Sequence, residues 1–208
     1  MARVRSHAYQ AQQSAGTIGG REFLFGEDAM KHRLEWSVGL LERTPGALDA
    51  LLRGLPMDWL SGNEGGNSWN ARDVVAHLIH GERTDWIPRA RMVLEHGENE
   101  TFVPFDRLGY VHESEAKSLA ELLDEFARLR VENLRELREM NLKEEDLRRR
   151  GRHPALGVVT LSELLATWAV HDLTHVHQIS RILAYPYREA VGPWSAYLGV
   201  LRCGGHGD

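Results

Sequence analysis

The 208-residue sequence contains a single cysteine, Cys203, so no internal disulfide can hold its fold together. It also lacks a hydrophobic run of the ~18 residues that a membrane span requires. The apolar stretch 164–170, for example, ends at His171. The basic first residues are not followed by an apolar segment, which argues against a secretory signal. We therefore expect a cytoplasmic protein that does not enter a membrane.

The sequence has no large excess of charge of either sign. Its 25 Lys and Arg residues stand against 30 Asp and Glu, for a net charge of −5 spread along the chain. A nucleic-acid partner is therefore not expected, because it would need a clustered basic surface. With 42% hydrophobic residues, the chain is long enough to bury a core of its own. What stands out is the count of eleven histidines, since histidine is the commonest metal ligand in proteins.

The chain divides into an aperiodic start and a helical remainder. Residues 1–29 are polar and glycine-rich, which predicts a poorly ordered extension ahead of one domain at 30–208. No strand-length alternation competes with the helical periodicity that follows. Four long helices and a short extra C-terminal one are predicted, at about 31–54, 70–96, 114–140, 160–184 and 194–202. The fold class is therefore all-α, a single helical bundle.

Local signals mark breaks and starts within these helices. Thr44-Pro45 predicts a restart in the first helix, and Pro88 predicts a kink near 84–88 in the second. Asn70 is the expected start of the second helix, and Thr160 with Glu163 forms a capping box at the start of the fourth.

The predicted connection 97–113 is unusually long for a loop, and such loops are often lids or binding loops. Its aromatic residues Phe102, Phe105 and Tyr110 are consistent with an apolar wall at a site, and equally with anchors that fix the loop to the core. Arg89 and Arg91 are likewise consistent with an anionic substrate or with salt bridges to the third helix.

His171 and His175 stand four residues apart in the fourth helix, so their imidazoles leave the same helical face. That face also carries Leu164, Trp168 and Ile179, and we expect it to be buried. Two such side chains can bind one metal ion at ~2.1 Å. They can equally be core histidines that hydrogen-bond to backbone or water, since this short spacing recurs by chance.

A third histidine, His77, lies between apolar neighbours on the buried face of the second helix. Two helices of one bundle can bring their core-facing imidazoles together, giving a three-histidine metal site with an open position. That arrangement is typical of catalytic sites. We expect His80 to be exposed. Gln178 shares a face with His171 and His175, and it is the candidate to hydrogen-bond a ligand histidine.

Together these segments resemble the DinB/YfiT-like superfamily. The resemblance rests on WNARDVVAHL at 69–78 and TLSELLATWAVHDLTH at 160–175, and it covers about residues 31–185. It implies that His77, His171 and His175 are three metal ligands. It also implies a four-helix bundle of up-down-down-up order, with the 97–113 connection crossing between parallel helices, and a homodimer.

Three neutral imidazoles leave a divalent metal its full charge, so that a bound water or thiol becomes more acidic. A metal-dependent hydrolase of small molecules follows from this chemistry. The resemblance adds a thiol-dependent S-transferase or isomerase, which would use a low-molecular-weight thiol cosubstrate. Zn, Ni, Mn and Fe all accept such a ligand set. The sequence does not identify a general base, so the catalytic residues stay unassigned.

The same residues test other classes of metal-binding protein. A ferritin-like di-iron site is excluded, because no glutamate has a histidine three residues later. A zincin-type peptidase would have glutamate at the position of Asp172, so a His-Asp-x-x-His variant is a weak alternative. A non-enzymatic metal-binding or stress-related binding module also stays open.

Overall fold

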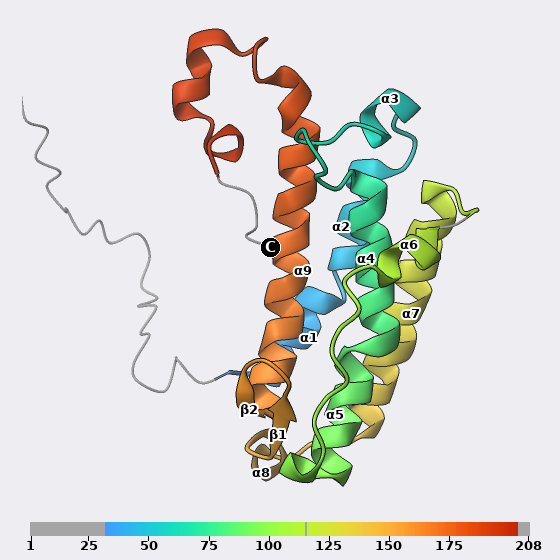
Figure 1. Ribbon diagram of the computed structural model, residues 1–208, viewed down its shortest axis with the longest axis vertical. Coiled ribbons are helices and arrows are strands. Elements are labelled where there is room, and N and C mark those ends of the chain that lie inside the picture. Colours follow the sequence, from blue (N-terminus) through green and yellow to red (C-terminus); the bar gives the residue numbers. More distant parts are fainter. Residues whose placement is uncertain (1–31, 115, 204–208) are drawn as a thin grey trace, which may run out of the picture. The chain divides into compact units, whose positions relative to one another are not determined.

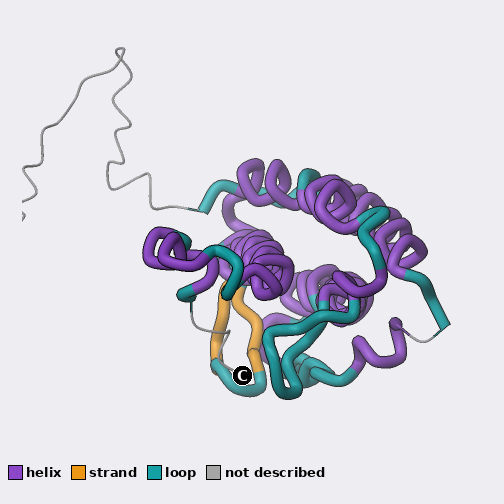
Figure 2. Tube along the Cα trace, turned by 90° about the horizontal axis from the view of Figure 1, so that it is seen from above, coloured by secondary structure: helices purple, strands orange, loops and turns teal. Residues whose placement is uncertain are grey.

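The computed structural model describes residues 32–114 and 116–203, and the predicted extension at 1–29 lies outside them. Four helical segments form a bundle (Figure 1) and are seen end-on in Figure 2. In chain order they are α1 (Leu34–Leu41) with α2 (Thr44–Leu52), α4 (Ala71–Thr84) with α5 (Trp86–Glu95), α7 (Leu119–Glu139), and α9 (Leu161–Ala184). The prediction of a single helical bundle is confirmed.

The order of the helices is up-down-down-up, as the resemblance implies. Figure 1 shows the first segment rising to α3 (Met57–Leu60), α4 and α5 descending, α7 descending beside them, and α9 rising again. After α5 the chain rises again through residues 100–114, which run alongside α5 and α4 and lead to the start of α7. We call these residues the crossing segment. No helix within the described residues is both long and apolar enough to span a bilayer.

Capping boxes begin three of the four segments. Asn70, Ser118 and Thr160 each accept a hydrogen bond from the backbone N–H three residues on, and that residue's carboxylate bonds back to the cap. These reciprocal bonds satisfy backbone donors that a helix leaves unpaired at its start. The predicted starts at Asn70 and Thr160 are therefore confirmed, whereas the third long helix begins at Leu119 and not at 114.

The two predicted breaks are also present. Pro88 has no N–H to donate to the Thr84 carbonyl, and the chain divides into α4 and α5 at Asp85. At the other break, α2 begins at Thr44 with Pro45 in its first turn, where a missing N–H costs nothing.

A β-hairpin precedes α9, and the expectation of no strands was wrong here. β1 (Arg150–His153) pairs antiparallel with β2 (Gly157–Thr160) around a three-residue turn. Gly157, with a φ of +76°, supplies the left-handed residue that such a turn needs. The Nδ1 atom of His153 accepts two backbone N–H bonds from the turn. Four-residue strands are too short for alternation to stand out in the sequence.

Several single-turn helices were not predicted, because one turn is too short to show a 3.6-residue period. They are α3, η2 (Gly97–Asn99), α6 (Gly109–Ser114) and α8 (Glu144–Leu147). The expected C-terminal helix at 194–202 is also wrong in kind. From Tyr185 onwards the chain forms 3₁₀ turns, because glycine and proline interrupt it: η3 (Tyr185–Tyr187), η4 (Gly192–Tyr197) and η5 (Gly199–Leu201).

Two apolar clusters fill the bundle, with a polar layer between them. One cluster joins α2, α4, the first half of α7 and the end of α9, and the other joins α1, α5, the second half of α7 and the first half of α9. Between them, near the middle of three of the four bundle segments, lie Glu82, Arg130 and Asp172, each at most 2% exposed. We call these three residues the central ion network.

Gly151→Ala is expected to lower the free energy of unfolding by about 1–3 kcal/mol, as overpacking does. A Cβ at this position would lie 2.8 Å from Val93 Cγ2 and 2.9 Å from Phe102 Cζ, both in the buried cluster. Urea unfolding followed by circular dichroism measures the change. Gly46→Ala is the matched control, because nothing lies within 4 Å of its Cβ. Equal stability of the two variants would contradict tight packing of the hairpin.

Candidate metal centre

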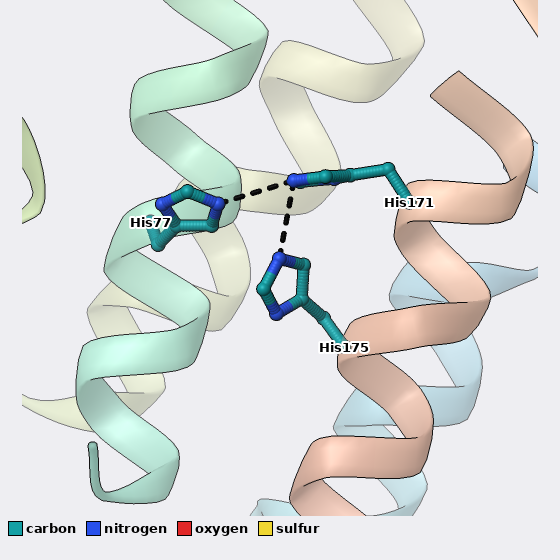
Figure 3. Close-up of side chains that lie close together, drawn as sticks. All are labelled: His77, His171 and His175. Carbon is teal, nitrogen blue, oxygen red and sulfur yellow. Dashed lines mark hydrogen bonds between the residues drawn. The ribbon is translucent and has the colours of Figure 1, made fainter. Parts of the chain in front are cut away.

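Three histidine side chains converge in the interior of the bundle. His77 projects from α4, and His171 and His175 project from successive turns of α9 (Figure 3). The Nε2 atom of His171 lies 3.1 Å from the Nε2 atoms of both other imidazoles. His77 and His175 are buried, and His171 is half-buried. The structure therefore brings together the three residues predicted from the sequence, which we call the three-histidine cluster.

Hydrogen bonding alone does not account for this convergence. A ring nitrogen of a neutral imidazole either donates or accepts, so the Nε2 atom of His171 cannot make two full hydrogen bonds to two facing nitrogens. The Nδ1 atoms of His77 and His171 are buried and have no hydrogen-bond partner in the structure. A cation between the three Nε2 atoms would instead use all three lone pairs.

Gln178 lies where the sequence predicted a partner for a ligand histidine. Its Oε1 atom is 2.8 Å from Nδ1 of His175. Because an amide oxygen only accepts, Nδ1 of His175 carries the proton and its Nε2 lone pair faces the cluster. The contact thus fixes the neutral tautomer that can bind a metal.

The spacing fits one metal ion. Two nitrogens that each lie ~2.1 Å from one ion, at angles between octahedral and tetrahedral, are roughly 3.0–3.4 Å apart. The observed 3.1 Å contacts fall in this interval, and one ligand atom of each histidine lies within 4.8 Å of the others. Within residues 32–114 and 116–203, no cysteine or carboxylate joins this group. A metal held here would keep open coordination positions.

Burial keeps the imidazoles of His171 and His77 uncharged. It lowers the pKa of His171 to about 2, with further lowering by His175, His77 and Arg130. Burial also lowers the pKa of His77 to about 3, helped by His175 and His80. Neutral imidazoles are the metal-binding form, so the site does not have to lose protons at neutral pH.

Aromatic rings enclose the cluster. The Trp69 ring centroid is 4.8 Å from that of His77, and Trp86 meets His171 edge-on at 5.1 Å. Phe105 of the crossing segment packs edge-on against His77 at 5.4 Å. These rings limit the access of bulk water and make the surroundings of the three imidazoles apolar.

The aromatic residues of the crossing segment divide between the two predicted roles. Phe102 is buried in the core and anchors the segment. Phe105, by contrast, contacts His77, and Tyr110 packs against Trp69 beside the cluster.

Arginines of α4 and α5 hold the crossing segment in place. Arg72 donates to the carbonyls of Ser114 and Lys117, and Arg83 pairs with Glu113. Arg89 donates to the Val103 carbonyl at 3.3 Å. These hydrogen bonds and ion pairs hold the crossing segment over the site.

Two expectations about nearby residues need correction. His80 is not exposed: its side chain is 13% accessible and packs edge-on against Phe105. Of the two alternatives for Arg91, the structure shows the salt bridge to the third long helix, at 2.5 Å from Glu136. Arg89 pairs with Asp85 on its own segment instead, also at 2.5 Å.

Sequence reasoning missed the central ion network. Arg130 Nη1 donates to Asp172 Oδ2 at 2.6 Å, and Nη2 donates to Glu82 Oε1 at 2.8 Å. Trp168 Nε1 also donates to that Glu82 oxygen, at 2.9 Å. One signal was available: Arg130 lies four residues from Phe126 and from Leu134, on the apolar stripe of its helix.

The network also bears on the peptidase alternative. The Asp172 carboxylate is 1% exposed and occupied by Arg130, so it is not placed as a general base beside the cluster. The zincin-like His-Asp-x-x-His hypothesis therefore has no support from the structure.

Comparison with known families settles the relationship. The model of the DinB superfamily matches residues 40–179. The chain belongs to the DinB superfamily. No curated protein matches this DinB-superfamily chain. Its resemblance to the superfamily, seen first in the histidine segments, is thereby confirmed.

The fold of this DinB-superfamily protein is also found in a solved structure. It is similar to YfiT from Bacillus subtilis, with 21% sequence identity, a TM-score of 0.63, and coverage of 81% of this chain and 93% of YfiT. YfiT is described as "a probable metal-dependent hydrolase with an unusual four-helix bundle topology". At this identity the likeness shows a shared fold.

The metal-free protein is expected to lose stability as the pH falls below about 6.5. Because the pKa values of His77 and His171 are about 3 and about 2 in the folded chain, the unfolded chain binds more protons in this range. Each histidine then lowers the free energy of unfolding by roughly 1.4 kcal/mol per pH unit. Urea unfolding of chelator-treated protein between about pH 7.5 and pH 5 measures the slope.

A control variant carries His77→Asn and His171→Asn, which removes both titrating groups. Its stability should depend less steeply on pH over the same interval. Parallel profiles for the two proteins would contradict the assignment of this slope to the buried histidines.

Proposed function

We propose that this protein is a metal-dependent enzyme whose His77, His171 and His175 bind one divalent ion. The proposal rests on one observation above the others: three Nε2 atoms converge at 3.1 Å contacts that hydrogen bonding cannot satisfy together. Zn, Ni, Mn and Fe are the candidate ions, because all accept three imidazoles and open positions.

The residues of the site have different roles. The three imidazoles hold the ion and add no negative charge to it, and Gln178 fixes the proton of His175 at Nδ1. When bound, a divalent ion supplies Lewis acidity, which polarises a substrate oxygen and acidifies water or a thiol. Phe105 and Trp69 exclude bulk water and give the substrate an apolar surface to contact. These features favour a small molecule with an apolar part.

Hydrolysis is the reaction we propose first. The description of YfiT, which has the same fold, supports it. A thiol-dependent S-transferase or isomerase is the second candidate. Within the described residues, no carboxylate joins the three-histidine cluster to serve as a general base. This favours the thiol-dependent enzyme, because a thiol acidified by the metal needs no general base. Cys203 is exposed and its thiol donates a hydrogen bond to the Gly199 carbonyl, so the sulfur would come from a low-molecular-weight thiol cosubstrate.

The homodimer, the cytoplasmic location and the domain boundary at residue 30 remain predictions. A non-enzymatic metal-binding module is a further outcome that the activity assays below can reveal.

Purified protein is expected to bind one Zn²⁺, Ni²⁺, Mn²⁺ or Fe²⁺ ion per chain, measured by mass spectrometry of the elements after dialysis. His77→Ala and His171→Ala should each remove most of the bound metal, because two imidazoles alone form a weak site. His177→Ala is the control, since His177 lies on the same helix outside the cluster. Full metal content in both cluster variants would rule out the proposed site.

The thermal midpoint of the same variants separates an enzyme from a structural metal protein. Loss of metal with little change in midpoint favours a functional ion, whereas unfolding on loss of metal favours a structural one.

Metal-loaded protein is expected to hydrolyse small activated esters or amides that carry an apolar group. The rates of the chelator-treated protein and of His171→Ala should be lower by at least about a hundredfold. A parallel assay offers an electrophile together with a panel of cellular thiols. Metal-dependent turnover only in the presence of a thiol would replace the hydrolase by the thiol-dependent enzyme. No turnover in either assay would favour the binding module.

A further inference from the structure

The central ion network has an unbalanced charge. The Arg130 guanidinium faces two carboxylates, those of Glu82 and Asp172, and all three side chains are 1% exposed. With both carboxylates ionised, the network carries one surplus negative charge within the core. The buried Arg89–Asp85 pair, by contrast, joins one guanidinium with one carboxylate. A buried surplus charge is unfavourable for folding by itself.

Pairing the Arg130 charge does not require the second carboxylate. Arg130 and one carboxylate would already make a neutral buried pair, and well-packed apolar residues often replace such pairs without loss of stability. Burial raises the pKa of Glu82, an effect that Arg130 opposes. Arg130 therefore only partly offsets the cost of burying a negative charge on Glu82.

The network lies directly behind the three-histidine cluster. Asp172 follows His171 in the chain, and Trp168, which donates to Glu82, stacks on Trp86 at 5.9 Å. Trp86 in turn meets the ring of His171. The Arg130 charge is close enough to help lower the pKa of His171. No carboxylate joins the cluster itself within the described chain, and the network is the counter-charge to which these contacts connect it.

We propose that Glu82 is a positioning and charge-balancing residue of the metal centre. Through Arg130 and Asp172 it fixes the turn of α9 that carries His171, and its negative charge offsets part of the charge of a divalent ion on three neutral imidazoles. This inference rests on the proposed metal site and adds to it a residue that does not touch the ion. The network is unbalanced on its own and better balanced when the site is loaded.

The test measures the dissociation constant for Zn²⁺ by competition with a chromophoric chelator. Glu82→Gln keeps the shape and most hydrogen-bonding capacity of the side chain but removes its charge. It is expected to raise the dissociation constant at least about tenfold, the effect typical of residues that support ligands from behind. Glu82→Asp keeps the charge and should stay within about threefold of the parent protein.

Glu136→Gln is the matched control. It removes a carboxylate from another arginine pair between helices, that of Arg91, but at a partly exposed position. It should leave Zn²⁺ binding unchanged. Urea unfolding of the metal-free proteins is measured alongside, because a merely structural Glu82 would change stability without changing the affinity of the folded protein for Zn²⁺. Should Glu82→Gln fail to fold, Asp172→Asn removes the same charge and carries the same expectation.

The outcomes are distinguishable. Weaker binding in Glu82→Gln with near-parent binding in Glu82→Asp supports the inference. Unchanged affinity in Glu82→Gln overturns it and leaves the three-histidine site intact. Equal loss in Glu82→Gln and Glu82→Asp overturns the role of charge. If the parent protein and His171→Ala bind Zn²⁺ equally, the proposed function itself fails.

Discussion

The geometry of the bundle depends on the hydrogen bonds of the Arg130 side chain. From α7 it donates to the Leu41 carbonyl at the end of α1, to Glu82 on α4 and to Asp172 on α9. A buried guanidinium has to be paired, so these bonds restrict how each helix can rotate about its own axis. Because Asp172 adjoins His171 in the chain, the orientation of the histidine faces follows from the same constraint.

Much of the architecture could be predicted from the sequence because it is encoded locally. Helical periodicity predicted the four segments, and Asn70, Thr160 and Pro88 marked starts and a break that the structure contains. The hairpin at 150–160 and the single-turn helices could not be predicted in this way. They depend on turn geometry and on packing against neighbouring elements, which a short stretch of sequence does not reveal.

The site shows the same division between local and tertiary information. His77, His171 and His175 could be singled out because each lies on a helical face that reads as buried. The burial of His80 could not be predicted, since the crossing segment that covers it is remote in sequence. Arg130 is one of many charged residues of its helix, and only its place on the apolar stripe distinguishes it in the sequence. Its partners come from two other helices.

The division of the three-histidine cluster between α4 and α9 has a consequence for the order of folding. Most of the domain after α4 lies between the two contributions, and contacts so distant in sequence involve a large loss of chain entropy when they form. A single helix offers only the His171 and His175 pair, so a partly folded chain presents an incomplete ligand set. The capacity to hold an ion tightly therefore arises only when the second and fourth segments have docked.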